Sequence, residues 1–158
     1  MNLKNPLSWL ALGFGSGLSP VAPGTAGSIF ALAIYYFFFF GNIIEWSDHL
    51  VFISFVVLSF FVGLYIYPKT VKEQNDPGSF VWDEFVGMWV ACIPLAIIDH
   101  SLQWLIIAFV LFRIFDIWKP LGIKKMDSKH GAFYVMIDDV VAGIFSGVLV
   151  IFLSYFLI

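Results

Sequence analysis

Long apolar stretches separated by short polar segments run along the whole chain, and five of them approach the length of a membrane helix. We predict helices over residues 28–44, 50–67, 79–98, 102–118 and 138–158. A helix needs about 20 mostly apolar residues to cross a bilayer. The pattern therefore predicts an all-α fold: a polytopic integral membrane helical bundle of about five spanning or partly spanning helices. One domain over residues 1–158 is expected, with a Gly/Pro-rich cytoplasmic loop before the first long helix.

The third stretch is the least regular of the five. Its uncharged part, residues 85–98, has fourteen residues, which as a helix measures roughly 21 Å against a hydrocarbon core of about 30 Å. To span, this helix must also include Asp83 and Glu84, about one turn inside the boundary. Pro94 is expected to kink it.

Composition supports a membrane protein. The chain is 61% hydrophobic and 12% charged, with a mean hydropathy of +0.94, whereas soluble domains carry about 25% charged residues. Nineteen Phe and six Trp in 158 residues would promote aggregation in water unless lipid covered them. Cys92 is the single cysteine, so no disulfide framework is expected.

The lysines predict the orientation of the helices. All seven fall in segments on the same side of the predicted bundle: Lys4, Lys69, Lys72, Lys119, Lys124, Lys125 and Lys129. The positive-inside rule makes this side cytoplasmic, with the N-terminus inside and the C-terminus outside. We interpret four tryptophans as interfacial belts, two at outer helix ends (Trp46, Trp104) and two at inner ends (Trp82, Trp118).

This topology brings five carboxylates and one arginine to a common depth just inside the cytoplasmic boundary: Asp83, Glu84, Asp116, Asp138, Asp139 and Arg113. Charged side chains inside a membrane cost at least a few kcal/mol near its centre and less near its surface, so they indicate a functional site. A structural explanation exists for each adjacent pair, since carboxylates in a first helical turn are favoured by the helix dipole. Two pairs together with Asp116 favour a functional role. Carboxylate oxygens of this kind suit Mg²⁺ or Mn²⁺ held together with a substrate phosphate.

Arg113, Asp116 and Lys119 are spaced i, i+3, i+6 in "FRIFDIWKP" and share roughly one helical face. They could form an ion pair beside a lysine that extends to the interface, or Arg113 and Lys119 could bind a lipid phosphate.

The segment "GFGSGLSPVAPGTAGS", residues 13–28, contains five Gly and two Pro. Backbone N–H groups and the hydroxyls of Thr25 and Ser28 could hold a phosphate at a helix N-terminus. Alternatively, its small residues allow close helix packing.

Missing motifs narrow the chemistry further. The chain has no Cys followed by Arg six positions later and no Asp-x-Asp-x-Thr, which argues against cysteine and aspartyl-phosphate phosphatases. The remaining mechanism is one in which a metal ion held by carboxylates activates a water molecule at a phosphoryl group. The competing hypothesis is a cation- or proton-coupled small membrane transporter, since intramembrane carboxylates also line ion paths. A structural membrane subunit is a third, which leaves the carboxylates unexplained.

Four motifs together resemble the phosphatidylglycerophosphatase A family: "GFGSGLSPVAPGTAGS", "VWDEFVGMW", "FRIFDIWKP" and "MIDDVVAG". The resemblance implies a Mg²⁺-dependent lipid phosphatase, a phosphoric monoester hydrolase of the bacterial inner membrane with its active site on the cytoplasmic side. It would convert phosphatidylglycerol phosphate to phosphatidylglycerol and inorganic phosphate, and no nucleic-acid partner is expected. One departure is "HGAFYVMIDD", where Ala132 and Tyr134 stand in place of glycines usual in the family.

Candidate site residues follow from these observations. The predicted metal ligands are Asp83, Glu84, Asp116, Asp138 and Asp139. The predicted catalytic carboxylates, one of them acting as base, are Asp83, Glu84, Asp138 and Asp139. The residues predicted to bind the substrate phosphate are Arg113, Lys119, Thr25 and Ser28.

Overall fold

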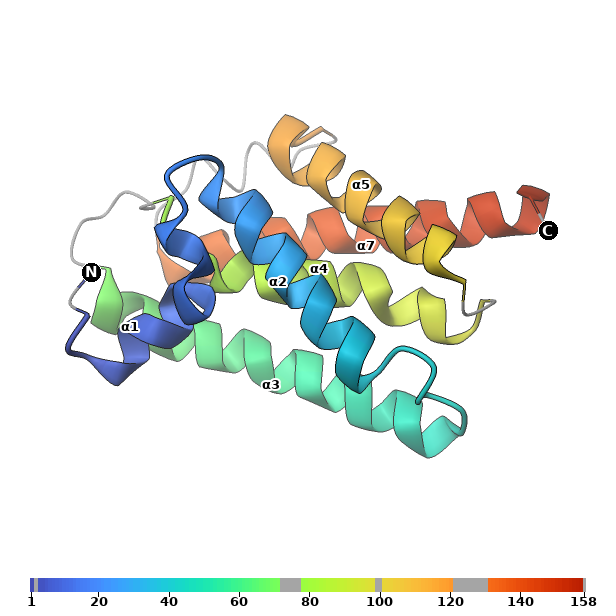
Figure 1. Ribbon diagram of the computed structural model, residues 1–158, viewed down its shortest axis with the longest axis horizontal. Helices are drawn as coiled ribbons and strands as arrows, with labels where there is room; N and C mark the ends of the chain where they lie inside the picture. Colours follow the sequence, from blue (N-terminus) through green and yellow to red (C-terminus); the bar gives the residue numbers. More distant parts are fainter. Residues whose placement is uncertain (2, 72–77, 99–100, 121–130, 158) are drawn as a thin grey trace.

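The computed structural model describes residues 1, 3–71, 78–98, 101–120 and 131–157, and within these ranges all regular structure is helical (Figure 1). The elements are α1 (Pro6–Ala11), η1 (Gly13–Leu18), α2 (Pro23–Phe38), α3 (Trp46–Thr70), α4 (Trp82–Cys92), η2 (Ile93–Ala96), α5 (Leu102–Trp118) and α7 (Ala132–Leu157). The predicted all-α class is therefore confirmed for the described residues.

The predicted helices differ from the observed ones at both their starts and their ends, by up to six residues. α5 has the predicted bounds, whereas α2 begins five residues before position 28, at Pro23, which is well suited to the first turn of a helix. α7 begins at Ala132, six residues before the predicted start at Asp138. The stretch before Asp138 is apolar and contains no helix breaker after Gly131, whose φ of +116° marks the turn into the helix.

Pro94 ends the regular part of the third apolar stretch, as predicted. α4 stops at Cys92, and a short 3₁₀ turn, η2, continues around Pro94. Proline lacks the N–H that would continue the α-helical hydrogen bonding, which explains the change of geometry.

Among the residues that the structure describes, two helices are long and apolar enough to cross a membrane: α3, and α7 over Ala132–Phe156, each 25 residues long. α2, α4 and α5 have 16, 11 and 17 residues. At 1.5 Å per residue they measure about 24, 17 and 26 Å, less than the roughly 30 Å of a hydrocarbon core. Of the about five spanning or partly spanning helices that the sequence predicts, two of the described helices have full spanning length.

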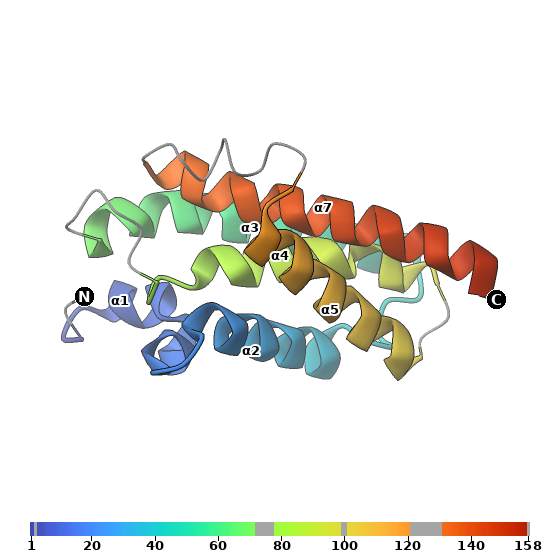
Figure 2. The same ribbon diagram turned by 90° about the horizontal axis from the view of Figure 1, so that it is seen from above.

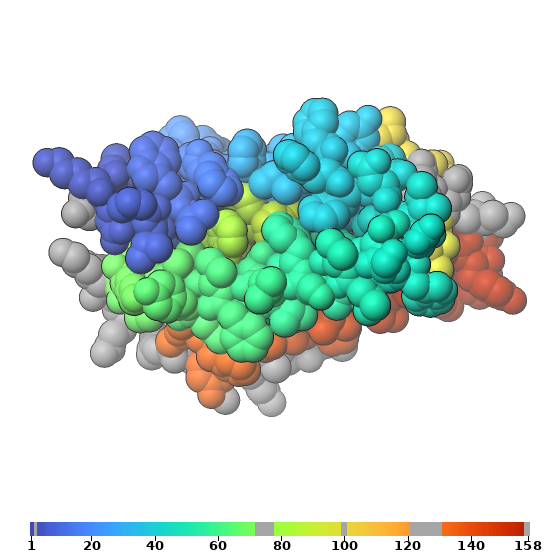
Figure 3. Space-filling view, turned by 90° about the horizontal axis from the view of Figure 1, so that it is seen from below, coloured from blue at the N-terminus to red at the C-terminus, as the bar shows by residue number. Residues whose placement is uncertain are grey.

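α3 presents an apolar face to the outside of the bundle and lies across the face seen in Figure 3. The side chains of Val51, Leu58, Phe61 and Tyr65 are each more than half exposed. Their spacing of seven, three and four residues places them on one side of the helix. Soluble monomers rarely expose an apolar surface of this kind, which supports contact with lipid.

The short helix α4 lies at the centre of the bundle, where it contacts α2, α3, α5 and α7 (Figures 1 and 2). Two of its indole N–H groups donate hydrogen bonds to neighbouring backbones: Trp89 Nε1 to the Ala31 carbonyl in α2 and Trp82 Nε1 to the Ser59 carbonyl in α3, both at 2.9 Å. Because other helices surround α4, these N–H groups find hydrogen-bond partners in protein and are not exposed to lipid.

The interpretation of four tryptophans as interfacial belts is wrong for two of them. Trp82 is 7% exposed and Trp104 is 1% exposed, so both belong to the core. Trp46 and Trp118 are 83% and 77% exposed, as residues at an interface would be. An indole at a helix end packs inward when a neighbouring helix covers that end.

α4 and α7 meet through glycines. A Cβ atom on Gly143 of α7 would collide with the carbonyl oxygen of Gly87 in α4 and lie 3.0 Å from Cβ of Val90. A Cβ atom on Gly87 would lie 2.7 Å from the carbonyl oxygen of Asp139. The two backbones are in direct contact, as small residues permit between membrane helices.

Replacing Gly143 by Ala is expected to lower the free energy of unfolding by roughly 1–2 kcal/mol, because a collision with a backbone oxygen cannot be relieved by a rotamer change. Unfolding in detergent micelles measures the effect. Gly78→Ala is the control, since its new methyl group would have no heavy atom within 4 Å, and it should stay within about 0.5 kcal/mol of the parent. Unchanged stability of Gly143→Ala would show that α4 and α7 separate without cost.

Candidate active site

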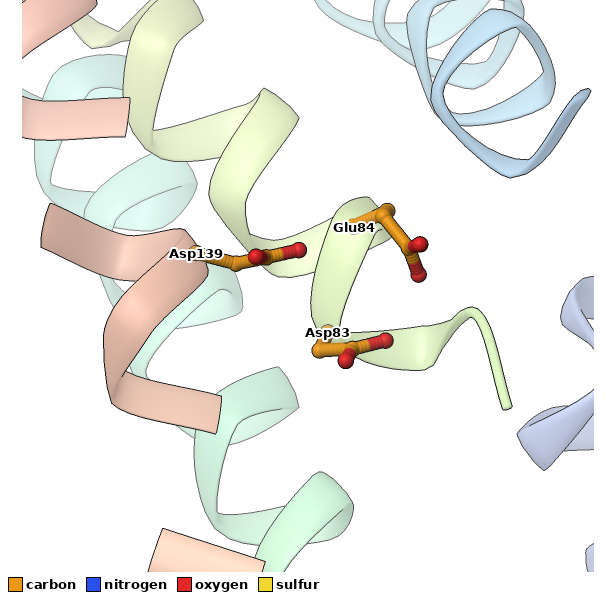
Figure 4. A group of neighbouring side chains, drawn as sticks. All are labelled: Asp83, Glu84 and Asp139. Atoms are coloured by element: carbon orange, nitrogen blue, oxygen red, sulfur yellow. The ribbon is translucent and has the colours of Figure 1, made fainter. Parts of the chain in front are cut away.

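Three carboxylates from two neighbouring helices lie close together (Figure 4). Asp83 and Glu84 come from the first turn of α4, and Asp139 comes from α7. Each offers one oxygen, and the three oxygens lie within 4.8 Å of one another. Asp83 and Asp139 are almost completely buried, at 5% and 3% exposure. We call these three residues the carboxylate cluster.

Local contacts fix the start of α4 where the cluster forms. The backbone N–H of Val81, the residue before α4, donates to the carbonyl of Ala11 in α1 at 2.9 Å. The contact of Gly87 with the backbone of Asp139 then brings α7 against α4 one turn further along. Both helices that supply the cluster, α4 and α7, are therefore positioned by backbone contacts rather than by long side chains.

The helix-dipole explanation does not apply to Asp138 and Asp139. Because α7 begins at Ala132, these two aspartates are its seventh and eighth residues, and its first turn contains no acidic residue. The dipole acts mainly within the first turn. It still favours Asp83 and Glu84, which do lie in the first turn of α4. The second pair therefore needs another reason for being buried.

Buried oxygens of Glu84 and Asp139 lack hydrogen-bond donors among the described residues. Glu84 Oε2 and Asp139 Oδ2 are buried and accept no hydrogen bond from any residue that the structure describes. An unsatisfied buried carboxylate oxygen is costly, and neighbouring carboxylates repel one another. A bound cation would relieve both costs, and oxygen donors are those that Mg²⁺ and similar hard cations prefer. The cluster thus fits a metal ion.

Asp116 of α5 forms the predicted i, i+3 ion pair with Arg113, at 2.6 Å between Oδ2 and Nη1. It also lies close enough to Glu84 and Asp139 for their charges to interact. The same Arg113 Nη1 donates to Ser28 Oγ at 3.1 Å, and Ser28 Oγ donates to the carbonyl of Gly24 at 2.8 Å. Arg113 therefore links α5 to α2 beside the carboxylate cluster.

Asp138 pairs with Lys119, at 2.6 Å between Oδ2 and Nζ. Lys119 follows the last residue of α5 in a left-handed backbone conformation, with φ of +46°. This ion pair joins the end of α5 to α7. The structure thus divides the five predicted carboxylates into the three of the cluster and two, Asp116 and Asp138, that each pair with a cation.

The close packing predicted for the Gly/Pro-rich segment is observed at two of its glycines, and a third glycine lies at the candidate site. Close packing applies to Gly17 and Gly27, where a Cβ atom would collide with the Ser79 carbonyl or lie 2.9 Å from Cβ of Val81. Gly24, in the first turn of α2, faces the site instead. A Cβ there would collide with Glu84 Oε1 and lie 3.4 Å from Arg113 Nη2.

Gly24 was not among the predicted site residues. Its signal in the sequence, one glycine among five in a short segment, does not distinguish it from those that serve packing. Of the predicted phosphate-binding residues, Ser28 is fully buried, and Thr25 lies with Arg113 along an open groove between α2 and α5.

Comparison with known proteins identifies a family. The family model for phosphatidylglycerophosphatase A matches residues 9–154. Phosphatidylglycerophosphatase A of Escherichia coli is 40% identical over 98% of this chain and 87% of its own length. The protein of the same name from Haemophilus influenzae is also 40% identical, over 100% of this chain and 94% of its own.

A third relative carries a different name. The putative phosphatidylinositol-3-phosphatase of Bacteroides thetaiotaomicron is 41% identical over 89% of both chains. None of these relatives is a transporter, so they give that alternative no support. No solved structure matches the chain significantly.

Proposed function

Because the chain belongs to the phosphatidylglycerophosphatase A family, we propose that it hydrolyses the terminal phosphomonoester of phosphatidylglycerol phosphate. The products are phosphatidylglycerol and inorganic phosphate, which makes the chain a phosphatase of phospholipid biosynthesis. The observation that carries the proposal is the buried carboxylate cluster beside Arg113. The names of the relatives share one substrate chemistry, a phosphomonoester on a membrane lipid.

Asp83, Glu84 and Asp139 are the proposed ligands of Mg²⁺, on the support of their convergent oxygens and the unpartnered Glu84 Oε2 and Asp139 Oδ2. The bound ion would supply an acidified water and a counter-charge for the phosphate. Asp116 and Asp138 lie at the edge of this group and complete the predicted ligand set. One carboxylate among Asp83, Glu84, Asp138 and Asp139 takes the proton of the attacking water.

Arg113 and Lys119 bind the phosphate oxygens in this proposal. Their ion pairs with Asp116 and Asp138 hold the two cations at the edge of the carboxylate cluster before substrate arrives. Preorganised cations cost little reorganisation when charge develops on the phosphate. Ser28, whose hydroxyl lies between Arg113 and the Gly24 carbonyl, positions the guanidinium. Thr25 lines the open groove beside Arg113, and in this proposal its hydroxyl contacts the lipid headgroup.

The proposed setting is the bacterial inner membrane, with a multi-pass chain and the site on the cytoplasmic side. α3 and α7 are long and apolar enough to cross completely, and in this proposal the shorter α2, α4 and α5 cross in part while packed against them. The charged residues support this placement, because residues 23–38 of α2 and 140–157 of α7 contain none. The acids therefore do not continue along a path through the bundle, as an ion carrier would require.

Phosphate release from phosphatidylglycerol phosphate in detergent micelles tests the function directly. The purified chain should turn over with Mg²⁺, lose activity in EDTA and regain it when Mg²⁺ is restored, because the carboxylate cluster alone supplies no counter-charge. Full turnover in the chelator would remove the metal from the mechanism, and no turnover under any condition would reject the function.

Amide substitutions separate metal binding from a structural role. Asp139→Asn, Asp83→Asn and Glu84→Gln keep the shape of each side chain but remove its charge. Each should lower activity by at least about 100-fold, or roughly 2.7 kcal/mol of transition-state stabilisation, in a folded and membrane-inserted protein.

Asp48→Asn is the matched control for these variants. Asp48 Oδ2 accepts the backbone N–H groups of Ile44 and Glu45 at the start of α3, and the amide oxygen of Asn can accept the same hydrogen bonds. This variant should retain normal activity. Near-normal activity of Asp139→Asn would leave that residue without a catalytic or metal-binding role.

Cysteine labelling tests the orientation. Single cysteines at positions 124 and 129, which lie outside the described residues, should react with an impermeant thiol reagent from the cytoplasmic side. A cysteine at position 48 should react from the periplasmic side. The native Cys92 is buried and serves as the unreactive background. Labelling of position 124 from outside would invert the proposed topology.

A further inference from the structure

An open groove runs between α2 and α5, next to the carboxylate cluster. Its volume is about 530 Å³, and the residues that line it are Thr25, Phe109, Val110, Arg113, Ile114, Ile117 and Trp118. Ligand sites in proteins typically measure about 300–1,000 Å³. Apart from Thr25 and Arg113, all of these residues are apolar.

Arg113 belongs to both the groove and the candidate active site. Its Nη1 is held by Asp116 and Ser28, while its Nε is buried and donates no hydrogen bond to any described residue. Gly24 leaves room at this point for Glu84 and Arg113 to lie close together. A single guanidinium therefore stands between an apolar groove and a set of carboxylates.

The residues on either side of Arg113 extend the apolar surface along α5. Phe109 and Val110 lie about one turn before it and Ile117 about one turn after it, a rise of roughly 6 Å in each direction. The groove thus offers a cation flanked by apolar side chains. This is the complement of an anionic headgroup attached to a hydrocarbon chain.

We propose that this groove binds one acyl chain of the phosphomonoester lipid substrate, with the phosphate at Arg113. The inference rests on the proposed function and adds the surface by which a lipid, rather than a water-soluble phosphomonoester, is recognised. The acyl chain of the lipid runs along Val110 and Phe109, away from the carboxylate cluster. Ile114, Ile117 and Trp118 pack against the part of the lipid nearest its headgroup.

Filling the groove tests the proposal. Val110→Trp should lower kcat/KM for diacyl phosphatidylglycerol phosphate in mixed micelles by at least about tenfold, mainly through KM, because uniform binding is lost. Hydrolysis of the deacylated, water-soluble substrate should change less than about twofold. Val57→Trp in α3 is the matched control: Val57 is 48% exposed and Val110 46%, and Val57 does not line the groove. It should change neither rate.

A binding measurement independent of catalysis accompanies the kinetics. Phosphatidic acid with a diazirine on its acyl chain should cross-link to residues 109–118 of the parent chain in micelles. This labelling should fall severalfold in Val110→Trp and persist in Val57→Trp. Equal labelling of all exposed helices would identify ordinary bilayer lipid and overturn the proposal.

The remaining outcomes are equally decisive. The proposal that the groove binds an acyl chain would also be overturned by an unchanged kcat/KM of Val110→Trp for the diacyl substrate. An equal loss of kcat/KM on both substrates would overturn it as well. Failure of the proposed function is separate from these results. It would appear as absence of phosphate release from either substrate by the parent chain, while cross-linking would still decide whether the groove binds a lipid phosphomonoester.

Discussion

Direct backbone contact between α4 and α7 is the constraint on which the rest of the structure depends. Gly87 and Gly143 allow the two helices to approach until a single added methyl group would collide with a carbonyl oxygen. At this separation Asp139 reaches the first turn of α4 and meets Asp83 and Glu84. Like charges at such distances repel strongly where water is scarce, so packing must supply the free energy that holds them together. The buried aromatic rings of Trp82, Phe85 and Trp89 contribute to this packing around α4.

The position of α4 also determines the position of the cations. Trp89 ties α4 to α2 through the Ala31 carbonyl, and Gly27 lets α2 approach Val81 at the start of α4. In turn, Ser28 of α2 accepts a hydrogen bond from Arg113 of α5, and Arg113 also pairs with Asp116 of the same helix. A chain of short contacts thus runs from the carboxylate cluster to the groove between α2 and α5. A change in helix packing would displace the carboxylates and Arg113 together.

The apolar pattern predicted the helices well and their environment poorly. The bounds of α5 and the break at Pro94 follow from hydropathy and proline chemistry. The start of α7 was missed because two adjacent aspartates were treated as a membrane boundary, whereas here they are covered by protein. An apolar stretch also looks the same whether lipid or other helices surround it, so neither the central position of α4 nor the burial of Trp104 could be predicted. The residues that form the carboxylate cluster were all predicted, but its separation from the two ion pairs depends on helix rotation and lateral packing, which spacing along one chain does not define.

The balance of charge in the site places a requirement on its chemistry. When ionised, the five carboxylates of the site carry five negative charges, and Arg113 and Lys119 contribute two positive charges. The net charge is therefore −3 in a largely buried region. A phosphomonoester brings further negative charge, about −1.5 to −2 near neutral pH. Two cations already engaged by Asp116 and Asp138 cannot offset both. A substrate phosphate can therefore enter the proposed site only with additional positive charge, and the unpartnered oxygens of Glu84 and Asp139 are where such charge would be held. On this argument the proposed function requires a cation at the carboxylate cluster, which would offset the charge of the carboxylates and of the substrate phosphate.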